Sequence, residues 1–584
     1  MNDHEMRAAI GRGDYLVAYD LAMRAASERP DDAAVRYLAV LALARAGATD
    51  RAAEQLAVFG LDGDAPAGAP TDLVEDLGAL RARLAKDAAM SVSGEERARR
   101  AGLAAQLYET TYRALDRPFA GVNAATMWSL AGDQQRSHAI ATEVLSLLAS
   151  PADGEDVYWT EATRAEALLL LGAVADARVA LRHALATVPD IASRATTRRQ
   201  LALVCELVGC DAGIVDVLEI PQVVHYTGHL APRLGANAED RLADQIAARL
   251  EAESVGFGYG ALACGADLIV AEALLARGAE LHVVFPCAQD DFVRVSVAPG
   301  GLEWVHRFED ALARAASVTY ATEGPYLGAP ELFAFGAEVA MGKALLRASY
   351  LATTVSQLAV WDGKPAAGPA GTAVDISAWE RTGCTRHVIS VDGGDPRANG
   401  KDDPAEGARS VRAMIFADVQ GFSRLSEGQV PAFVDHVLSA LAATIDSYAD
   451  AVRFRNTWGD GIYLVFDDVA VAARCALALQ DTMRSVDLAA LGLPPLALRV
   501  GAHAGPVFEQ IDPITGVPGF FGVEVTRTAR VEPGTPPGAV YVTDPFAALV
   551  ALDGLDELSC QYVGPVPTAK GFGTFPLYTL RRRG

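Results

Sequence analysis

The sequence has few cysteines, no long apolar run and a single dense cluster of basic residues. Its 584 residues contain no apolar stretch of about 18 residues, which is what a membrane-spanning helix requires. The segment Met1–Pro30 is broken by charges, which a signal peptide does not allow. The 7 cysteines include no CxxC pair, which argues against both a zinc site and a disulfide framework. We therefore expect a soluble, cytoplasmic protein.

Positive charge is also scarce. The net charge is −24, which disfavours a surface for nucleic acid or anionic lipid, because both reward clustered Lys and Arg. The one dense basic run, 581–583, is interpreted as a solvated tail. We expect no nucleic-acid partner and no membrane partner.

Residues 1–212 are rich in Ala, Leu and Arg and predict one helix after another. Gly13-Asp14 opens a helix with an apolar face, and Gly47-Ala48 repeats this opening 34 residues later. Helix pairs with this period resemble tetratricopeptide repeats, which stack because each pair leaves an apolar side for its neighbour. The resemblance implies an array that binds a protein partner. Residues 62–101 break the period, so a plain helical bundle is the alternative.

Residues 220–391 alternate between predicted strands and helices. Strand-like runs occur at 223–226, 281–286 and 357–361, with helices expected at 238–252 and 266–277. This alternation is typical of a parallel α/β sheet. Glycine-rich turns are expected near 228, at 256–260 and at 363–371, where backbone amides can approach phosphate. Residues 392–410, rich in Gly, Asp and Pro, predict a linker.

This middle pattern resembles the SLOG superfamily, which implies a Rossmann-like domain for a nucleotide-like ligand. Asp267 and Glu272 are the candidate acids. Asp267 can equally be a charge at a helix N-terminus, and Glu272 a surface residue. A ligand sensor is the favoured interpretation, with an enzyme and a structural spacer as alternatives.

The strongest group of motifs lies in residues 411–584. An apolar strand at 411–417 delivers Asp418, and a tight turn follows whose amides can hold two phosphates of a triphosphate: Gly421, Phe422 and Ser423. Asp460 lies at the predicted tip of a hairpin. Two carboxylates on adjacent strands can share two Mg²⁺ ions, which activate a ribose hydroxyl and neutralise the triphosphate.

Three further features follow in order. Residues 498–507 predict a strand, a turn and a second strand, with His503 interpreted as a packed residue rather than a general base. Thr526 and Arg530 lie one helical turn apart and share a face, which can present Arg530 to charge developing at the α-phosphate. Lys570 precedes the final strand and is a candidate to hold the terminal phosphates.

Together these motifs resemble the class III adenylyl and guanylyl cyclases from about Arg409 to Leu580. The resemblance implies an α+β ferredoxin-like domain that cyclises a nucleoside triphosphate. It implies that Asp418, Asp460 and the Val419 carbonyl hold two ions of Mg²⁺ or Mn²⁺, while Arg530 and Lys570 act on the phosphates. It also implies a homodimer, because in this family the metals and the arginine of one site come from different subunits.

The base pocket departs from the family pattern. Asn456 stands where adenylyl cyclases have lysine, Gly519 where they have Asp or Thr, and Thr526 where they have asparagine. The Glu and Cys that read guanine are absent too. The altered pocket is similar to that of bacterial pyrimidine cyclases, with further candidate residues at Arg453, Arg455 and Trp458. A purine product, a pyrimidine product and loss of activity all stay open, as does a scaffold with a cyclase fold.

The expected architecture is therefore multidomain. An all-α repeat at 1–212 precedes a Rossmann-like α/β domain at 220–391, and a linker at 392–410 leads to an α+β cyclase domain at 411–584. We expect the first part to bind a partner, the second a ligand, and the third to make a second messenger.

Overall fold

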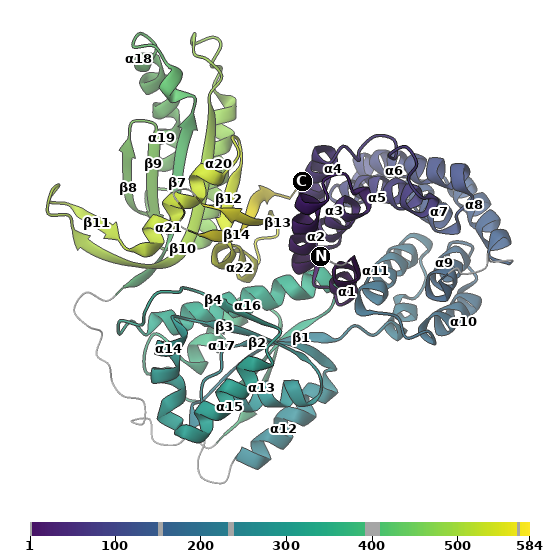
Figure 1. Cartoon of the computed structure of the whole chain (residues 1–584), viewed down its shortest axis with the longest axis horizontal. Coiled ribbons are helices and arrows are strands. Elements are labelled where there is room, and N and C mark those ends of the chain that lie inside the picture. Colours follow the sequence, from purple (N-terminus) through teal and green to yellow (C-terminus); the bar gives the residue numbers. More distant parts are fainter. Residues whose placement is uncertain are drawn as a thin grey trace. The chain divides into compact units, whose positions relative to one another are not determined.

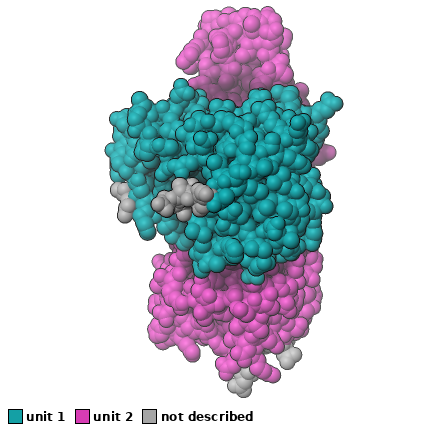
Figure 2. All heavy atoms as spheres, turned by 90° about the vertical axis from the view of Figure 1, so that its right-hand side faces the viewer, with its two compact units in different colours: residues 1–220, 350–352, 583–584 teal, residues 221–349, 353–582 magenta. Residues whose placement is uncertain are grey.

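The computed structural model describes residues 3–149, 156–231, 239–391, 409–568, 571 and 573–583. The chain forms two compact units, one of residues 1–220, 350–352 and 583–584, the other of residues 221–349 and 353–582 (Figure 2). No helix in the described ranges is long and apolar enough to cross a membrane.

The first unit is helical, as predicted (Figure 1). Its helices are α1 (Asp3–Gly11), α2 (Tyr15–Glu28), α3 (Ala33–Arg45), α4 (Thr49–Val58), α5 (Thr71–Met90), α6 (Gly94–Leu115), α7 (Pro118–Leu130), α8 (Gln134–Leu147), α9 (Val157–Leu170), α10 (Val174–Leu185) and α11 (Ile191–Val208), followed by the short η1 (Ala212–Val217).

Glycine turns pair these helices. Gly13 joins α1 to α2 at φ 77° and Gly47 joins α3 to α4 at φ 74°, a backbone region that other residues seldom adopt. Gly132 and Gly172 do the same between α7 and α8 and between α9 and α10. The stretch that breaks the period, residues 62–101, contains the end of the connection after α4, the 20-residue α5 and the start of the 22-residue α6. The period is lost because these two helices are longer than their neighbours.

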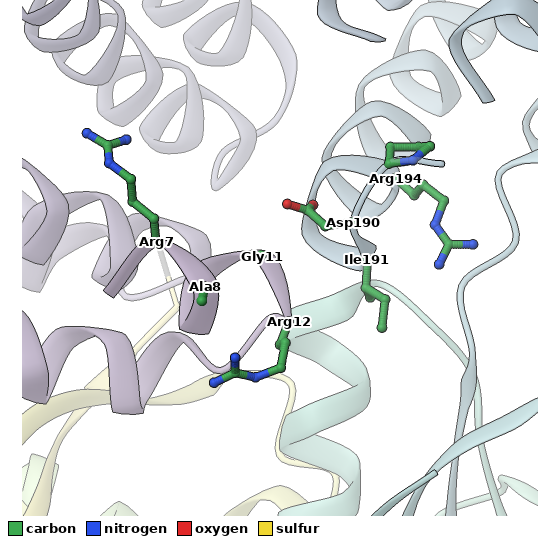
Figure 3. A pocket seen from close by; sticks show the side chains of 8 residues that line it. Arg7, Ala8, Gly11, Arg12, Asp190, Ile191 and Arg194 are labelled. Carbon is green, nitrogen blue, oxygen red and sulfur yellow. The ribbon is translucent and has the colours of Figure 1, made fainter. Parts of the chain in front are cut away.

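A pocket of about 400 Å³ lies between α1 and α11 (Figure 3). Gly11 lets the two helices meet there, because a Cβ at this position would lie 2.8 Å from Asp190 Oδ2. Arg7, Arg12 and Arg194 line the pocket but point in different directions (Figure 3). Arg12 pairs with Asp14, and Arg194 donates to a backbone carbonyl. The three arginines therefore do not converge on one anion.

The middle region contains a parallel six-stranded sheet in the order β4-β3-β2-β1-β5-β6. Its strands are β1 (Gln222–Gly228), β2 (Val255–Gly260), β3 (Glu280–Phe285), β4 (Ser317–Tyr320), β5 (Val355–Trp361) and β6 (Thr385–Ser390). Its helices are α12 (Glu239–Ala252), α13 (Ala266–Ala276), α14 (Gln289–Phe292), α15 (Leu302–Ala313), α16 (Glu331–Leu351) and α17 (Thr372–Glu380), with short η3 (Val293–Val297) and η4 (Ala298–Gly300). The predicted parallel α/β architecture is confirmed.

One prediction in this region is wrong. Residues 256–260 form the buried strand β2, not a phosphate-binding turn. The glycines serve close packing, since a Cβ at Gly260 would lie 2.6 Å from the ring of Tyr226, and one at Gly258 would collide with Leu274. Glycine in a strand often marks such close approach of a neighbour.

The last region has a mixed sheet in the order β13-β14-β12-β10-β7-β9-β8, with β11 paired to β10. Its strands are β7 (Ser410–Gln420), β8 (Val452–Trp458), β9 (Gly461–Phe466), β10 (Ala497–Ile511), β11 (Pro518–Phe521), β12 (Val540–Thr543), β13 (Leu558–Pro567) and β14 (Thr574–Arg582). Its helices are α18 (Val430–Ala432), α19 (Ser439–Asp446), α20 (Val469–Ser485), α21 (Val523–Val531) and α22 (Asp544–Leu552), with η6 (Phe422–Arg424), η7 (Phe433–Leu438) and η8 (Glu532–Gly534).

The turn expected within 498–507 is absent from the described fold, because β10 is one continuous strand of 15 residues. Its glycines mark places where other elements lie directly on the strand. A Cβ at Gly501 would lie 2.6 Å from the Glu532 amide nitrogen, and one at Gly505 would lie 2.9 Å from Glu524 Cγ. The spacing of these glycines is therefore explained by close packing of β10 under α21 and η8.

Candidate functional site

The sheet brings Asp418 and Asp460 together, as predicted. Asp418 is near the end of the central strand β7, where it pairs with Gly461 of β9 on one side and with Arg499 of β10 on the other. Asp460 sits beside Gly461 in the tight turn that joins β8 to β9. Burial raises the pKa of Asp460, and the nearby Asp418 carboxylate raises it further. Two close carboxylates of this kind favour the binding of positive charge.

Arg499 and Glu532 complete this group, and sequence reasoning missed both. Arg499 Nη2 lies 2.5 Å from Asp418 Oδ2 and 3.0 Å from Glu532 Oε1. Burial raises the pKa of Glu532 to about 7; Arg499 opposes this rise, and Asp418 and Asp460 add to it. Arg499 thus holds a carboxylate on each side. The position of Arg499 could be found only from the strand register, which places Arg499 opposite Asp418.

The donor set fits a hard divalent cation. Asp418 and Asp460 offer carboxylate oxygens, and the Val419 backbone follows Asp418 in the same strand; oxygen donors suit Mg²⁺ and Mn²⁺. Burial and the neighbouring Asp418 carboxylate both raise the pKa of Asp460, and a bound cation would offset both effects. Within the described residues no group of three or more His, Cys, Asp or Glu side chains has a metal-binding arrangement, and Asp418 and Asp460 are two candidate side-chain donors.

The turn after β7 keeps its predicted place. Gly421 adopts φ 97°, and a Cβ there would lie 3.2 Å from the Pro495 carbonyl oxygen. Phe422 anchors the turn by packing on Phe433, with ring centroids 4.8 Å apart. Ser423 is exposed. The turn leads into a short 3-10 helix, and the next helical segment begins at Val430.

Helix α21 carries the second half of the predicted site. Its buried face consists of Glu524, Thr528 and Val531, whereas Thr526 is exposed. The Nε of Arg530 is buried without a hydrogen-bond partner in the described structure. Among the described residues, no hydrogen bond or ion pair joins Arg530 to Asp418 or Asp460. One chain therefore does not bring the arginine and the carboxylates into contact.

Of the residues expected to read the base, Thr526 lies on α21 and the other two lie on separate hairpins. Asn456 is on β8, and its Oδ1 accepts a hydrogen bond from the Thr457 amide at 2.8 Å. The side-chain amide of Asn456 is therefore left as a donor. Gly519 is on β11 opposite Gln510 and contributes only backbone. Trp458 is 59% exposed and stacks on Phe416 at 6.4 Å.

The remaining candidates are surface residues or undescribed. Arg453 pairs with Asp467 and Arg455 with Asp446, and both arginine side chains are 59% exposed. Both arginines are therefore solvated and ion-paired. Lys570 lies outside the described residues.

The middle sheet places a second polar group at the ends of β1 and β5, where the strand order reverses. Thr227 Oγ1 donates to Asp375 Oδ2 at 2.5 Å. Asp267, in the first turn of α13, is 9% exposed, and its Oδ1 has no hydrogen-bond partner in the described structure. Burial raises the pKa of both acids. Glu272 instead forms a two-pronged ion pair with Arg307, so it is structural.

Comparisons with known proteins agree with two parts of this description. Residues 14–128 match the family model "Tetratricopeptide Repeats-Sensor", and residues 406–580 match "Adenylate and Guanylate cyclase catalytic domain". The N-terminal region is thus of the tetratricopeptide type, and the C-terminal region is an adenylate/guanylate cyclase catalytic domain.

Individual relatives are similar over this last region. An adenylate cyclase of Anabaena cylindrica is 27% identical over 172 residues, which are 27% of this chain and 31% of that protein. The atrial natriuretic peptide receptor 2 of Homo sapiens is 30% identical over 174 residues, 28% of this chain and 16% of the receptor. The chain therefore spans less than a third of the length of these relatives. The solved guanylate cyclase domain of RhGC from Catenaria anguillulae in complex with GTP is 18% identical, with a TM-score of 0.26 over 30% of this chain and 97% of its own.

Proposed function

We propose that this chain is a nucleotidyl cyclase, which converts a nucleoside triphosphate into a 3′,5′-cyclic nucleotide and pyrophosphate. The observation that carries the proposal is the pairing of Asp418 and Asp460 at the end of β7, within the region that matches the cyclase catalytic domain. Cyclisation needs charge neutralisation at the triphosphate and an activated ribose hydroxyl, and this pair is the feature suited to both.

Asp418, Asp460 and the Val419 carbonyl would hold two ions of Mg²⁺ or Mn²⁺, which when bound supply Lewis-acid activation of the 3′-hydroxyl and neutralise phosphate charge. The amides of Gly421, Phe422 and Ser423 would hold the β- and γ-phosphates. The 3′-oxygen attacks the α-phosphorus and loses its proton to water, the bond to the β-phosphate oxygen breaks, and pyrophosphate leaves.

The helix residues act on the same centre. Arg530 would stabilise the charge that develops at the α-phosphate, with Thr526 one turn before it on the helix as a hydrogen-bonding group. Lys570 would hold the terminal phosphates. Since Arg530 does not contact the carboxylates of its own chain, we propose that it serves the site of a second chain, so that a homodimer has two equivalent sites.

Exposed apolar side chains support a dimer. They lie on β8, on the β10–β11 hairpin and at the start of α21: Trp458, Ile511, Ile514, Val517, Phe521 and Val523, each between 41% and 93% exposed. Large exposed apolar side chains gathered on neighbouring elements often mark a protein interface. We infer that this surface joins two cyclase domains.

Ile514→Asp is expected to make the protein monomeric and to lower turnover by about tenfold or more, because a buried interfacial charge costs at least about 1.4 kcal/mol. Sedimentation and product formation measure the two effects. The matched control is Val58→Asp in the helical unit, where the side chain is 77% exposed. If Ile514→Asp stays dimeric, the interface lies elsewhere.

Asn456 and Gly519 are the two residues expected to face the base. The amide of Asn456 is a donor, because its oxygen is engaged by the Thr457 backbone. A hydrogen-bond donor can bind O6 of guanine, O2 and N3 of cytosine, O4 of uracil or N1 of adenine, because each of these atoms is an acceptor. Gly519 provides no side-chain acceptor for the amino group of adenine. Purine and pyrimidine bases both present an acceptor to such a donor.

The direct test is turnover of ATP, GTP, CTP and UTP with Mg²⁺ or Mn²⁺, with the cyclic product identified by mass. We expect one cyclic nucleotide to dominate. A cyclic pyrimidine would show that Asn456 and Gly519 belong to a rebuilt pocket, whereas a cyclic purine would show that other residues read the base. Absence of any cyclic product would favour the alternative, a cyclase-fold scaffold.

For the rest of the chain we propose the domain limits 1–212, 220–391 and 411–584, with a linker between the last two.

The middle domain is proposed to be a SLOG-like sensor of a nucleotide-like ligand. The polar residues Thr227, Asp267 and Asp375 support this proposal, because they lie where the strand order reverses, and open α/β sheets bind ligands at that place. Buried acids there suit hydroxyl or amino groups of the ligand better than its phosphates. The helical repeats are proposed to bind a protein partner, in a cytoplasmic signalling protein.

A further inference from the structure

Glu524 is a buried carboxylate on helix α21, and its partners come from three elements. Its side chain is 3% exposed. His503 Nε2 on β10 lies 2.9 Å from Oε2, and Thr322 Oγ1 lies 2.5 Å from Oε1. Arg527, one turn further along α21, approaches Oε2 at 3.4 Å. Burial alone would raise the pKa of Glu524, but these partners outweigh it and lower the pKa to about 2. The carboxylate is therefore charged and fully engaged.

Thr322 belongs to the α/β region, in the segment that follows β4, and is separated from Glu524 by 202 residues. It is completely buried. Its oxygen accepts a hydrogen bond from the Gly324 amide at 3.0 Å, so the hydroxyl proton is directed at Glu524. A hydrogen bond to a charged acceptor in a buried site is among the stronger ones in proteins. The next residue, Glu323, pairs with Arg527 at 3.0 Å.

Helix α21 depends on such contacts. It has 9 residues, too few to be stable by itself. Glu524 begins the buried face that continues through Thr528 and Val531. A side chain fixed at the first turn of this face sets the rotation of the helix about its axis, and thus the direction in which Thr526 and Arg530 project.

We propose that Glu524 is a positioning residue through which the α/β region, by way of Thr322, sets the orientation of the helix that carries Thr526 and Arg530. This inference rests on the proposed cyclase activity. A ligand bound to the α/β sheet would change turnover through the contact between Thr322 and Glu524, since a shift of the segment after β4 reaches α21 directly.

A second contact joins the same two regions without touching α21. Lys343 Nζ on α16 lies 2.7 Å from Asp544 Oδ2 on α22, and a Cβ at Gly342 would collide with the carbonyl of Ala548 on that helix. If attachment alone matters, losing this contact should cost as much activity as losing Thr322. If the position of α21 matters, the two losses should differ.

The experiment uses four variants of the full chain. Thr322→Val keeps the shape but removes the hydroxyl, and Thr322→Ser retains it. Lys343→Gln removes the second contact. Thr319→Val on β4 is the matched control, because among the described residues its hydroxyl bonds only to the Val283 carbonyl, at 3.4 Å. Steady-state kinetics with the preferred triphosphate give kcat and KM, and hydrogen exchange of residues 523–531 reports on α21 without requiring turnover.

We expect Thr322→Val to lower kcat by about tenfold with KM changed by less than about twofold, because one charge-assisted hydrogen bond is lost. Exchange in α21 should rise in the same variant. Thr322→Ser, Lys343→Gln and Thr319→Val should keep the kcat and the exchange of the unaltered chain.

Two results would overturn the inference: a Thr322→Val variant with normal kcat and normal exchange, or equal losses in Thr322→Val and Lys343→Gln. If the unaltered chain forms no cyclic nucleotide, the proposed function fails. The exchange data then still decide whether Thr322 holds α21.

Discussion

Asp418→Asn is expected to abolish cyclic-nucleotide formation, with a fall in kcat of about a thousandfold or more, because losing one carboxylate ligand removes several kcal/mol of charge stabilisation in the transition state. The fold should survive, since Asp418 is only partly buried and Asn retains an oxygen that can accept from Arg499. Product formation with Mg²⁺ and Mn²⁺ measures the loss, and thermal unfolding checks the fold. Asp446→Asn is the matched control, because this exposed aspartate pairs only with Arg455 on the hairpin.

Mixing inactive variants tests whether the site is shared between two chains. Arg530→Ala should be as inactive as Asp418→Asn when each is assayed alone. After exchange of subunits, half of the dimers contain one chain of each kind, and one of their two sites is intact. The mixture should therefore recover about a quarter of the unaltered activity. If no activity returns although the subunits mix, Arg530 acts within its own chain.

The pair of carboxylates could be predicted from the sequence, and the residues around it could not. An apolar strand ending at Asp418 and a hairpin tip at Asp460 are local patterns, and adjacent strands follow from them. The partners Arg499 and Glu532 required the register of β7 against β10, which no local pattern encodes. The same holds for Thr322 and Glu524, which lie 202 residues apart.

Glycine caused both errors of fold prediction. The glycines at 256–260 and those at 501 and 505 predict turns, since glycine is common where the chain reverses. In the structure they lie in strands under a neighbouring side chain or helix. Gly13 and Gly47, by contrast, do adopt positive φ between helices. Sequence alone does not show whether a glycine is needed for its positive φ or for its missing Cβ, because glycine meets both requirements.

Asp375→Asn is expected to remove much of the loss of stability that the chain suffers as the pH rises from about 4 to 7. Burial raises the pKa of Asp375 to about 7, although Thr227 opposes the rise, whereas an unfolded aspartate titrates near pH 3.9. Between these values the folded chain holds a proton on Asp375 that the unfolded chain has lost. The contribution of Asp375 to the free energy of unfolding therefore falls with rising pH, by at most about 4 kcal/mol, and stays level above the folded pKa.

Urea unfolding at pH 5 and 8, followed by tryptophan fluorescence, measures the change, since Trp379 lies buried on the same helix. Some slope should persist, because the pKa of Asp267 is raised too. The exposed Glu380→Gln should keep the full slope, and an equally steep slope in Asp375→Asn would show that this carboxyl is already ionised in the folded chain at pH 5.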